Sequence, residues 1–331
     1  DRVASRGLGD VYKRQTISNA VEAPMFVLGE TYDFEWIYSE SQKPAPWTEL
    51  VSDNFIMTVP SHEVRDLTNP TSLMEWWDIA LDMEHELYGF LPWPRVERAV
   101  FDVQISAGWM HSGYPFMAHD LSVEEVVNLT HMSENGDWGM FHELGHNHQW
   151  MPSTLPGTTE TGCNFASVYL MEELVGIGIE GHGALDLAQR ENRMRNYFED
   201  GSNIDNWTVW TALDTYLIIK EEWGWTPITE ALSVYYTLPE DEVPSTGDEE
   251  FNAWVLHLSN ATGYNLAPYH SAWGFPLTPQ TYSSLFHLPV WVDDPLRGEF
   301  FTYEAMIRNL GANNSTCLLY TSPSPRDATL S

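Results

Sequence analysis

The sequence is poor in basic residues. Only 15 of its 331 residues are Lys or Arg, against 48 Asp and Glu, and the formal net charge is −33. Binding to nucleic-acid phosphates requires a basic surface, and so does docking on an anionic membrane. We therefore exclude nucleic acid as a partner, and the charge argues against docking on an anionic membrane. A charge this negative keeps a protein soluble in salty surroundings, which favours a marine or extracellular setting.

Long apolar runs and cysteines are scarce as well. No run of 18 or more apolar residues occurs, so the sequence contains no candidate transmembrane segment. The two cysteines are Cys163 and Cys317, and only the first lies in the body of the chain, so no internal disulfide is expected there. Aromatic residues are plentiful, with 15 Trp, 15 Tyr and 14 Phe, which excludes a disordered body.

The two ends differ from the body in composition. Residues 1–15 hold four of the basic residues, and residues 316–331 are rich in Ser and Pro. Both resemble translated sequencing-adapter read-through in a metagenomic reading frame; the alternative is a pair of ordinary disordered termini. We interpret both as artefacts and set them aside. The native N-terminus would then be missing, so the lack of a signal peptide says nothing about export.

Predicted strands precede predicted helices along the chain. Apolar and β-branched runs predict strands at 53–59 and 99–106, and apolar residues at helical spacing predict a helix after Asn69–Pro70. Further helices are predicted at 138–150, 158–175, 184–199, 207–222, 226–237 and 248–260. This order indicates one α+β domain over 16–315, with a β-rich part at about 30–110 and a helical part at about 120–315.

The chemistry is concentrated in residues 142–146, which read His-Glu-Leu-Gly-His. Residues i and i+4 of a helix share one face, so His142 and His146 can present both imidazoles to one metal ion. Glu143 lies about 100° further round the helix, where it can act as general base on a zinc-bound water. A catalytic zinc site needs a third protein ligand.

The third ligand does not follow two familiar spacings. A metzincin would have Gly and His where this chain has Gln149 and Pro152, and the thermolysin spacing falls on Ala166. The nearest downstream carboxylate is Glu160, in the first turn of a helix that we expect to be capped by Thr158 or its neighbour Thr159. Glu160 is therefore the candidate third ligand; the alternative is an acidic residue that merely stabilises the helix N-terminus.

The stretch HELGHNHQW, a loop and TETGCN resemble the zinc motif of the enhancin-like, mucin-degrading zinc metallopeptidases (peptidase family M-sixty, gluzincin type). Similar stretches at 106–119, 221–236 and 258–278 extend the resemblance over roughly residues 100–280. Gly162 and Cys163 depart from the small or β-branched residues that the family usually carries there. The resemblance implies a zincin-like fold, one Zn²⁺ held by His142, His146 and Glu160, and Glu143 as the catalytic residue.

The resemblance also implies an endopeptidase acting on protein or glycoprotein substrates, notably O-glycosylated mucin-like proteins, outside the cell or at its surface. Two alternatives stay open. One is a non-catalytic glycoprotein- or glycan-binding module on the same fold, and the other is a different zinc hydrolase such as a deacetylase.

Other residues near the motif have two interpretations each. His111 and Tyr114 are candidate donors to the oxyanion of the tetrahedral intermediate, or belong to a packed turn. His148 is expected to face away from the ligand pair and to anchor a loop, and Cys163 either approaches the metal or is a small core residue. Two further residues are candidates for contacts with the ligands: Asp137, as a helix cap or a histidine-orienting residue, and Asn164, as a hydrogen-bond partner of the ligands. Four aromatic residues could either stack on sugars or fill the core: Trp223, Trp225, Trp273 and Phe275.

Overall fold

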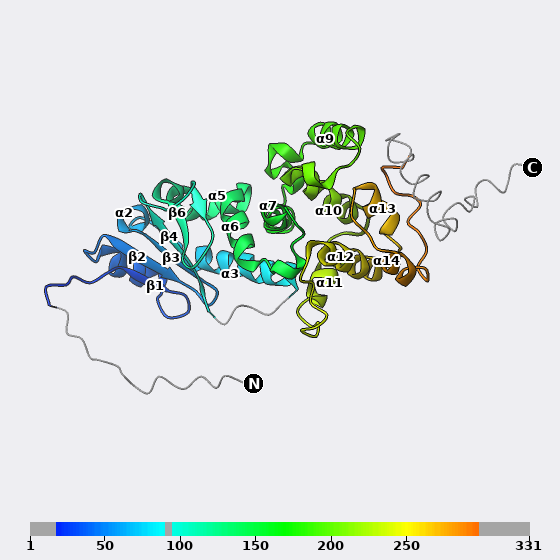
Figure 1. Cartoon of the computed structure of the whole chain (residues 1–331). Coiled ribbons are helices and arrows are strands. Elements are labelled where there is room, and N and C mark those ends of the chain that lie inside the picture. Colours follow the sequence, from blue (N-terminus) through cyan, green and yellow to red (C-terminus); the bar gives the residue numbers. More distant parts are fainter. Residues whose placement is uncertain (1–17, 90–94, 298–331) are drawn as a thin grey trace, which may run out of the picture.

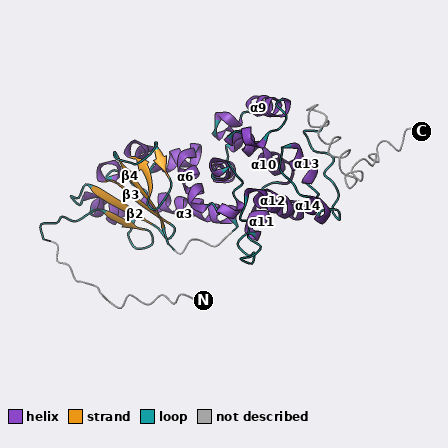
Figure 2. Cartoon of the chain, viewed as in Figure 1, coloured by secondary structure: helices purple, strands orange, loops and turns teal. Residues whose placement is uncertain are grey.

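The computed structural model describes residues 18–89 and 95–297. The segments 1–15 and 316–331, and the end of the expected domain up to 315, lie outside the described residues. Figures 1 and 2 show a mixed β-sheet with helices in the N-terminal part of the chain and helices alone in the C-terminal part. The predicted α+β fold, with the sheet first and the helices after it, is confirmed.

The sheet has the strand order β1-β2-β3-β4-β6-β5. The strands are β1 (Met25–Val27), β2 (Trp47–Val51), β3 (Phe55–Pro60), β4 (Glu97–Asp102), β5 (Met110–His111) and β6 (Phe116–His119). β3 and β6 run parallel to β4, whereas β5 is antiparallel to β6 and forms one edge. The two predicted strands correspond to β3 and β4, with shifted ends. The others escape prediction because they have two to five residues each, too few to show an alternating pattern.

Helix α3 (Pro70–Tyr88) connects β3 to β4 and covers one face of the sheet. Its start agrees with Asn69 and Pro70, since proline fits the first helical turn, where its missing N–H is not needed. Trp77 is completely buried against Phe55, with ring centroids 5.1 Å apart, and its indole N–H donates to the carbonyl of Val126 at 3.2 Å. This core holds α3 behind the sheet.

The C-terminal helices enclose a second hydrophobic core. They are α9 (Leu187–Glu199), α10 (Val209–Trp223), α11 (Thr226–Val234), α12 (Gly247–Thr262), α13 (Ala267–Ala272) and α14 (Pro279–Ser284). Trp225, Trp273 and Phe275 are buried in this core, and Trp223 packs on Trp291 with centroids 4.6 Å apart. These aromatic residues therefore fill the core instead of offering a surface for stacking on sugars.

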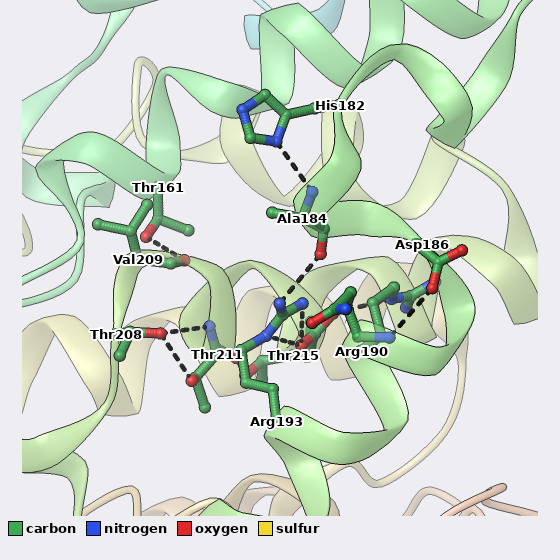
Figure 3. A network of polar contacts seen from close by, with 12 residues as sticks. Thr161, His182, Ala184, Asp186, Arg190, Arg193, Thr208, Val209, Thr211 and Thr215 are labelled. Atoms are coloured by element: carbon green, nitrogen blue, oxygen red, sulfur yellow. Dashed lines mark hydrogen bonds and ion pairs between the residues drawn. The ribbon is translucent and has the colours of Figure 1, made fainter.

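A buried carboxylate joins α9 to α10. Asp214 of α10 is fully buried and accepts hydrogen bonds from Arg190 Nε and Arg193 Nε, each at 2.8 Å. Arg193 also donates to the carbonyl of Ala184 at 3.0 Å, which fixes the loop before α9 (Figure 3). A buried charge of this kind is tolerated only when it is paired and hydrogen-bonded, and here two guanidinium groups supply both.

The two cores meet at the helix that carries the histidine motif and at a second helix packed against it. Helix α6 (Trp138–His148) and helix α8 (Asn164–Leu170) contribute side chains to both cores, because Trp138 and Tyr169 pack against each of them. Within the described residues, every helix is too short or too polar to cross a lipid bilayer.

The burial of His270 in α13 predicts that stability depends on pH. Its Nδ1 lies 3.0 Å from the carbonyl of Leu266, and its buried Nε2 has no hydrogen-bond partner among the described residues. Burial lowers the pKa of His270 to about 4, against about 6.5 in an unfolded chain. Below pH 6.5 the unfolded chain then binds more protons than the folded one, so the free energy of unfolding should fall between pH 6.5 and about 4.

Urea unfolding at several pH values measures this fall. The variant His270→Asn keeps a donor for Leu266 but does not titrate, so its free energy of unfolding should change less over the same window. An equal change in both proteins would assign the pH dependence to other groups.

Candidate metal centre

Helix α6 carries the histidine motif and begins at a capped residue. Asp137 precedes the helix and its carboxylate accepts from the backbone N–H of Met140 at 2.9 Å, so its role as a helix cap is confirmed. Phe141 and Leu144 turn into the sheet core and leave the opposite face open. On that face the rings of His142 and His146 stand edge to face, with centroids 4.7 Å apart.

A second short helix brings Glu160 to this face. Helix α7 (Thr159–Gly162) leads directly into α8, so the expected continuous helix 158–175 is divided at Cys163 and ends in a π-helical turn over Met171–Val175. Glu160 lies in the first turn, as expected. The expected side-chain cap is absent, because the hydroxyl of Thr158 donates instead to the carbonyl of Leu155 at 2.7 Å.

The three candidate ligands converge. Glu160 Oε2 lies 3.1 Å from His142 Nε2 and 3.4 Å from His146 Nε2. The two imidazoles are largely buried, at 18% and 13% exposure, whereas the Glu160 side chain is 58% exposed. The cluster therefore has one side against the protein interior and one side open to solvent.

Cys163 belongs to the same cluster, since ligating atoms of His142, His146, Glu160 and Cys163 lie within 4.8 Å of one another. Its Sγ is 3.3 Å from Nδ1 of His142 and 3.6 Å from Nε2. An atom nearer to Nδ1 lies beside the ring, away from the Nε2 lone pair that faces Glu160. Burial raises the pKa of the Cys163 thiol, and the charges of Glu160 and Glu143 add to the effect. We therefore interpret Cys163 as an uncharged side chain that packs beside the site and is not a metal ligand.

Each imidazole has an amide partner at Nδ1. Asn164 Oδ1 lies 2.7 Å from Nδ1 of His142, and Gln149 Oε1 lies 3.0 Å from Nδ1 of His146. The sequence indicated Asn164, which is one helical turn after Glu160. It missed Gln149, which comes three residues after His146, just past the end of α6; that spacing is the signal that could have identified it.

His148 faces away from His142 and His146, as expected, and lies in the interior, where its ring packs on that of His85 with centroids 4.8 Å apart. Its Nδ1 is 2.8 Å from the carbonyl of Leu144 and 3.0 Å from Glu84 of α3, and both side chains are completely buried. Burial by itself lowers the pKa of His148, but the hydrogen bond to Glu84 raises it overall. One turn further along α3, Tyr88 donates to the carbonyl of Gly162 at 2.9 Å. Helix α3 thus holds the end of α6 and the end of α7 together.

Strand β5 and the loop after it contain the two candidate oxyanion donors, His111 at the end of the strand and Tyr114 in the loop. His111 is held by Ser106 Oγ at 2.8 Å and by the carbonyl of Ser112 at 3.0 Å. Tyr114 is half exposed, with the guanidinium of Arg95 4.2 Å from its ring centroid. Both side chains thus have local partners. The loop is joined to α6 through Asn147, which the sequence analysis did not single out.

Asn147 makes a paired contact with the loop backbone. Its amide accepts from the N–H of Gly113 at 2.9 Å and donates to the carbonyl of Gly113 at 3.0 Å. The same amide donates to the buried carboxylate of Glu97 in β4 at 3.0 Å. The sheet, the loop and α6 are therefore connected at one residue, five positions beyond His142.

A mixed sheet followed by an HExxH-bearing helix, with a glutamate from the next helix beside it, is the arrangement of zincin-like metallopeptidases. Residues 19–274 match the family Peptidase M60, enhancin and enhancin-like, and the chain belongs to that family. Among solved structures, a ZmpB metallopeptidase from Clostridium perfringens is similar, with TM-score 0.64 and 16% identity over 81% of this chain and 56% of that one.

Other similar proteins carry different names. A functionally unknown conserved protein from Bacillus anthracis has TM-score 0.71 and 21% identity, over 81% of this chain and 57% of that one. TRPM8 channel-associated factor 2 from Bos taurus is 44% identical over 85% of this chain. A TRPM8 channel-associated factor homolog from Xenopus laevis is 42% identical, also over 85%. The chain spans about a third of the length of these curated relatives, 31% of each.

The packing of α6 against α7 and α8 leads to a prediction at Gly145. A Cβ atom there would lie 2.5 Å from the carbonyl oxygen of Cys163 and 3.0 Å from Cβ of Ala166, so the helices would have to separate. We expect Gly145→Ala to lower the free energy of unfolding by about 1–3 kcal/mol and to weaken any metal binding at the candidate ligand cluster, because Glu160 moves with α7. Isothermal titration with zinc and urea unfolding measure the two effects.

Gly183→Ala is the matched control, because a Cβ atom at Gly183 has no neighbour within 4 Å. If the Gly145→Ala protein matched this control in both measurements, the close helix contact would not determine the geometry of the ligand cluster.

Proposed function

We propose that this protein is a zinc-dependent endopeptidase in which His142, His146 and Glu160 hold one Zn²⁺ and Glu143 is the general base. The observation that supports this most directly is the convergence of the carboxylate of Glu160 on both imidazoles, at 3.1 and 3.4 Å. Helix dipole stabilisation, the alternative role of Glu160, requires no such approach to the histidines.

The donor set fits a catalytic zinc site. Two histidines and one glutamate are a ligand set of catalytic zinc, which leaves a coordination position for water, whereas structural sites use four protein donors. The position of Cys163 beside the ring of His142 favours three donors over four. The exposed side of Glu160 supplies the opening to solvent through which a substrate would enter.

Zinc, when bound, would polarise the scissile carbonyl and lower the pKa of a water molecule. Glu143 is half buried, and among the described residues its carboxylate has no hydrogen-bond or ion-pair partner, so it is available to accept a proton. In the proposed mechanism Glu143 takes the proton from the attacking water and then delivers it to the leaving nitrogen. His111 and Tyr114 are proposed as donors to the oxyanion.

The edge strand β5 suggests how a peptide would be aligned. Among the described residues no strand pairs with its outer side, so its backbone groups can pair with an extended substrate. We propose O-glycosylated, mucin-like proteins as substrates and an extracellular or cell-surface location. In support, an M60 catalytic domain from Clostridium perfringens ZmpC, solved in complex with the sialyl T antigen, is similar in fold, with TM-score 0.58 and 15% identity over 81% of this chain and 56% of that one.

A second candidate function is a non-catalytic binding module. It is favoured by the curated relatives, which are named for association with the TRPM8 channel and not for hydrolysis. Metal content does not separate the two functions, because a binding module could also hold zinc. The two functions are separated by a variant that keeps its zinc and loses hydrolysis, because only an enzyme has hydrolysis to lose.

Replacing Glu143 tests the catalytic step. Glu143→Gln keeps the size of the side chain but removes the base, so zinc content should stay at one equivalent while hydrolysis falls by about 10²–10⁴-fold. Peptide products from a mucin-type glycoprotein, with and without its glycans, would be mapped by mass spectrometry. His146→Ala, which removes a ligand, should lose zinc as well. A wild-type protein that holds zinc and releases no peptide from either substrate would favour the binding module.

Replacing Glu160 tests the third ligand. Glu160→Gln exchanges a carboxylate for a poorer zinc donor, so zinc affinity should fall steeply. The matched control is Glu124→Gln, which removes an exposed carboxylate from the first turn of the equally short helix α4 (Val123–Val126). A helix-dipole role would cost either variant only about 0.3–1 kcal/mol of stability. Unchanged zinc affinity in the Glu160→Gln protein would exclude Glu160 as a ligand.

A further inference from the structure

Two amide side chains surround the ligand cluster, and each of them has both of its polar atoms engaged. Gln149 follows the end of α6, and Asn164 begins α8. The oxygen of each amide lies against Nδ1 of one imidazole, at 3.0 Å for Gln149 and 2.7 Å for Asn164. Neither residue is a candidate metal ligand.

The nitrogen of each amide reaches the backbone beside Glu160. Gln149 Nε2 donates to the carbonyl of Thr159 at 2.5 Å, and Asn164 Nδ2 donates to the carbonyl of Glu160 at 2.7 Å. The first carbonyl belongs to the peptide unit before Glu160 and the second to the peptide unit after it. Both peptide units that flank Glu160 are therefore fixed by the same side chains that contact the histidines.

The chemistry of these contacts determines the tautomer of each histidine. A backbone carbonyl only accepts hydrogen bonds, so the NH₂ group of each amide must face it and the amide oxygen must face the imidazole. Because an amide oxygen accepts and does not donate, Nδ1 must carry the hydrogen, which leaves the Nε2 lone pair free toward Glu160. A carboxylate could accept from the imidazole but has no hydrogen for the carbonyl.

Gly162 leaves room for one of the two amides. A Cβ atom at this position would lie 2.5 Å from Nε2 of Gln149, so any larger residue displaces the amide from the carbonyl of Thr159. Gly162 thus leaves the space that the amide of Gln149 occupies.

From these contacts we propose that Gln149 and Asn164 are positioning residues, each of which orients one histidine and holds the backbone of Glu160, so that the three donors are arranged before zinc binds. This inference rests on the proposed zinc site. It adds that two neutral amides outside the ligand set determine the affinity of that site.

The experiment measures zinc affinity by competition with a chelator, and the free energy of unfolding without metal, in Gln149→Leu, Asn164→Leu and Gly162→Ala. Zinc affinity should fall by about 10–100-fold in each leucine variant, the usual effect of removing a partner of a metal ligand. It should fall in Gly162→Ala as well, although alanine favours a helix over glycine. A general loss of stability would not explain a fall of zinc affinity in Gly162→Ala, because this substitution should not weaken the helix.

Asn252→Leu is the matched control. Asn252 is a buried amide of α12 that donates to the carbonyls of Asp248 and Pro276 and accepts from Thr278, so its loss removes comparable hydrogen bonds outside the site. This variant should lose stability but keep its zinc affinity. Equal zinc affinities in wild type, Gln149→Leu and Asn164→Leu would overturn the proposal.

Gln149→Glu and Asn164→Asp separate the two halves of each contact. Both keep an acceptor for the imidazole and lose the donor to the backbone, so part of the affinity lost in the leucine variants should return. If none returned, the orientation of the histidines would not be the role of these residues. A wild-type protein that fails to bind one equivalent of zinc would instead contradict the proposed function, before any variant is compared.

Discussion

The close approach of α6 to α7 and α8 is the constraint on which the candidate metal centre depends. At Gly145 the helix backbone lies so near to Cys163 that a single Cβ atom would not fit. Because α7 is only four residues long, Glu160 cannot be more than one turn from this contact. Tyr88 of α3 donates a hydrogen bond to the carbonyl of Gly162. Thr161 donates to the carbonyl of Val209 in α10 at 3.0 Å (Figure 3). The position of Glu160 is thus fixed by neighbours on three sides.

The same helices join the two hydrophobic cores. The sheet core holds one side of α6 through Phe141 and Leu144, and the helical core begins at α8 and continues through α10 and α12. A site between two cores is supported by packing on both sides, while Glu160 keeps one side of the ligand cluster open to solvent. This is the arrangement expected of a metal site in which the protein fixes the donors and a substrate approaches from solvent. Membership of the M60 family, with relatives named both as metallopeptidases and as channel-associated factors, is compatible with hydrolysis and with binding alone.

Much of this arrangement is predictable from local sequence signals. His142 and His146 are four residues apart on a helix capped by Asp137, and the long apolar periodicity after Pro70 gives α3. The short strands are not predictable, since two to five residues do not form a pattern. Nor are the contacts between distant segments, such as Asn147 with Glu97, because nothing in the local sequence of α6 indicates which strand it will meet. Gln149 is an intermediate case: its spacing to His146 is visible, but its second contact, with Thr159, depends on the fold of the intervening loop.

The buried pairing of Asp214 with Arg190 and Arg193 has a consequence for the behaviour of so acidic a chain in salt. Mobile ions screen exposed charges far more than buried ones. Arg190 is 3% exposed and Arg193 16% exposed beside the buried Asp214, whereas many carboxylates of the described residues are exposed and repel one another. Rising ionic strength therefore weakens the repulsion and leaves this internal attraction almost unchanged, so the balance of charge in the folded protein becomes more favourable as the medium becomes more saline.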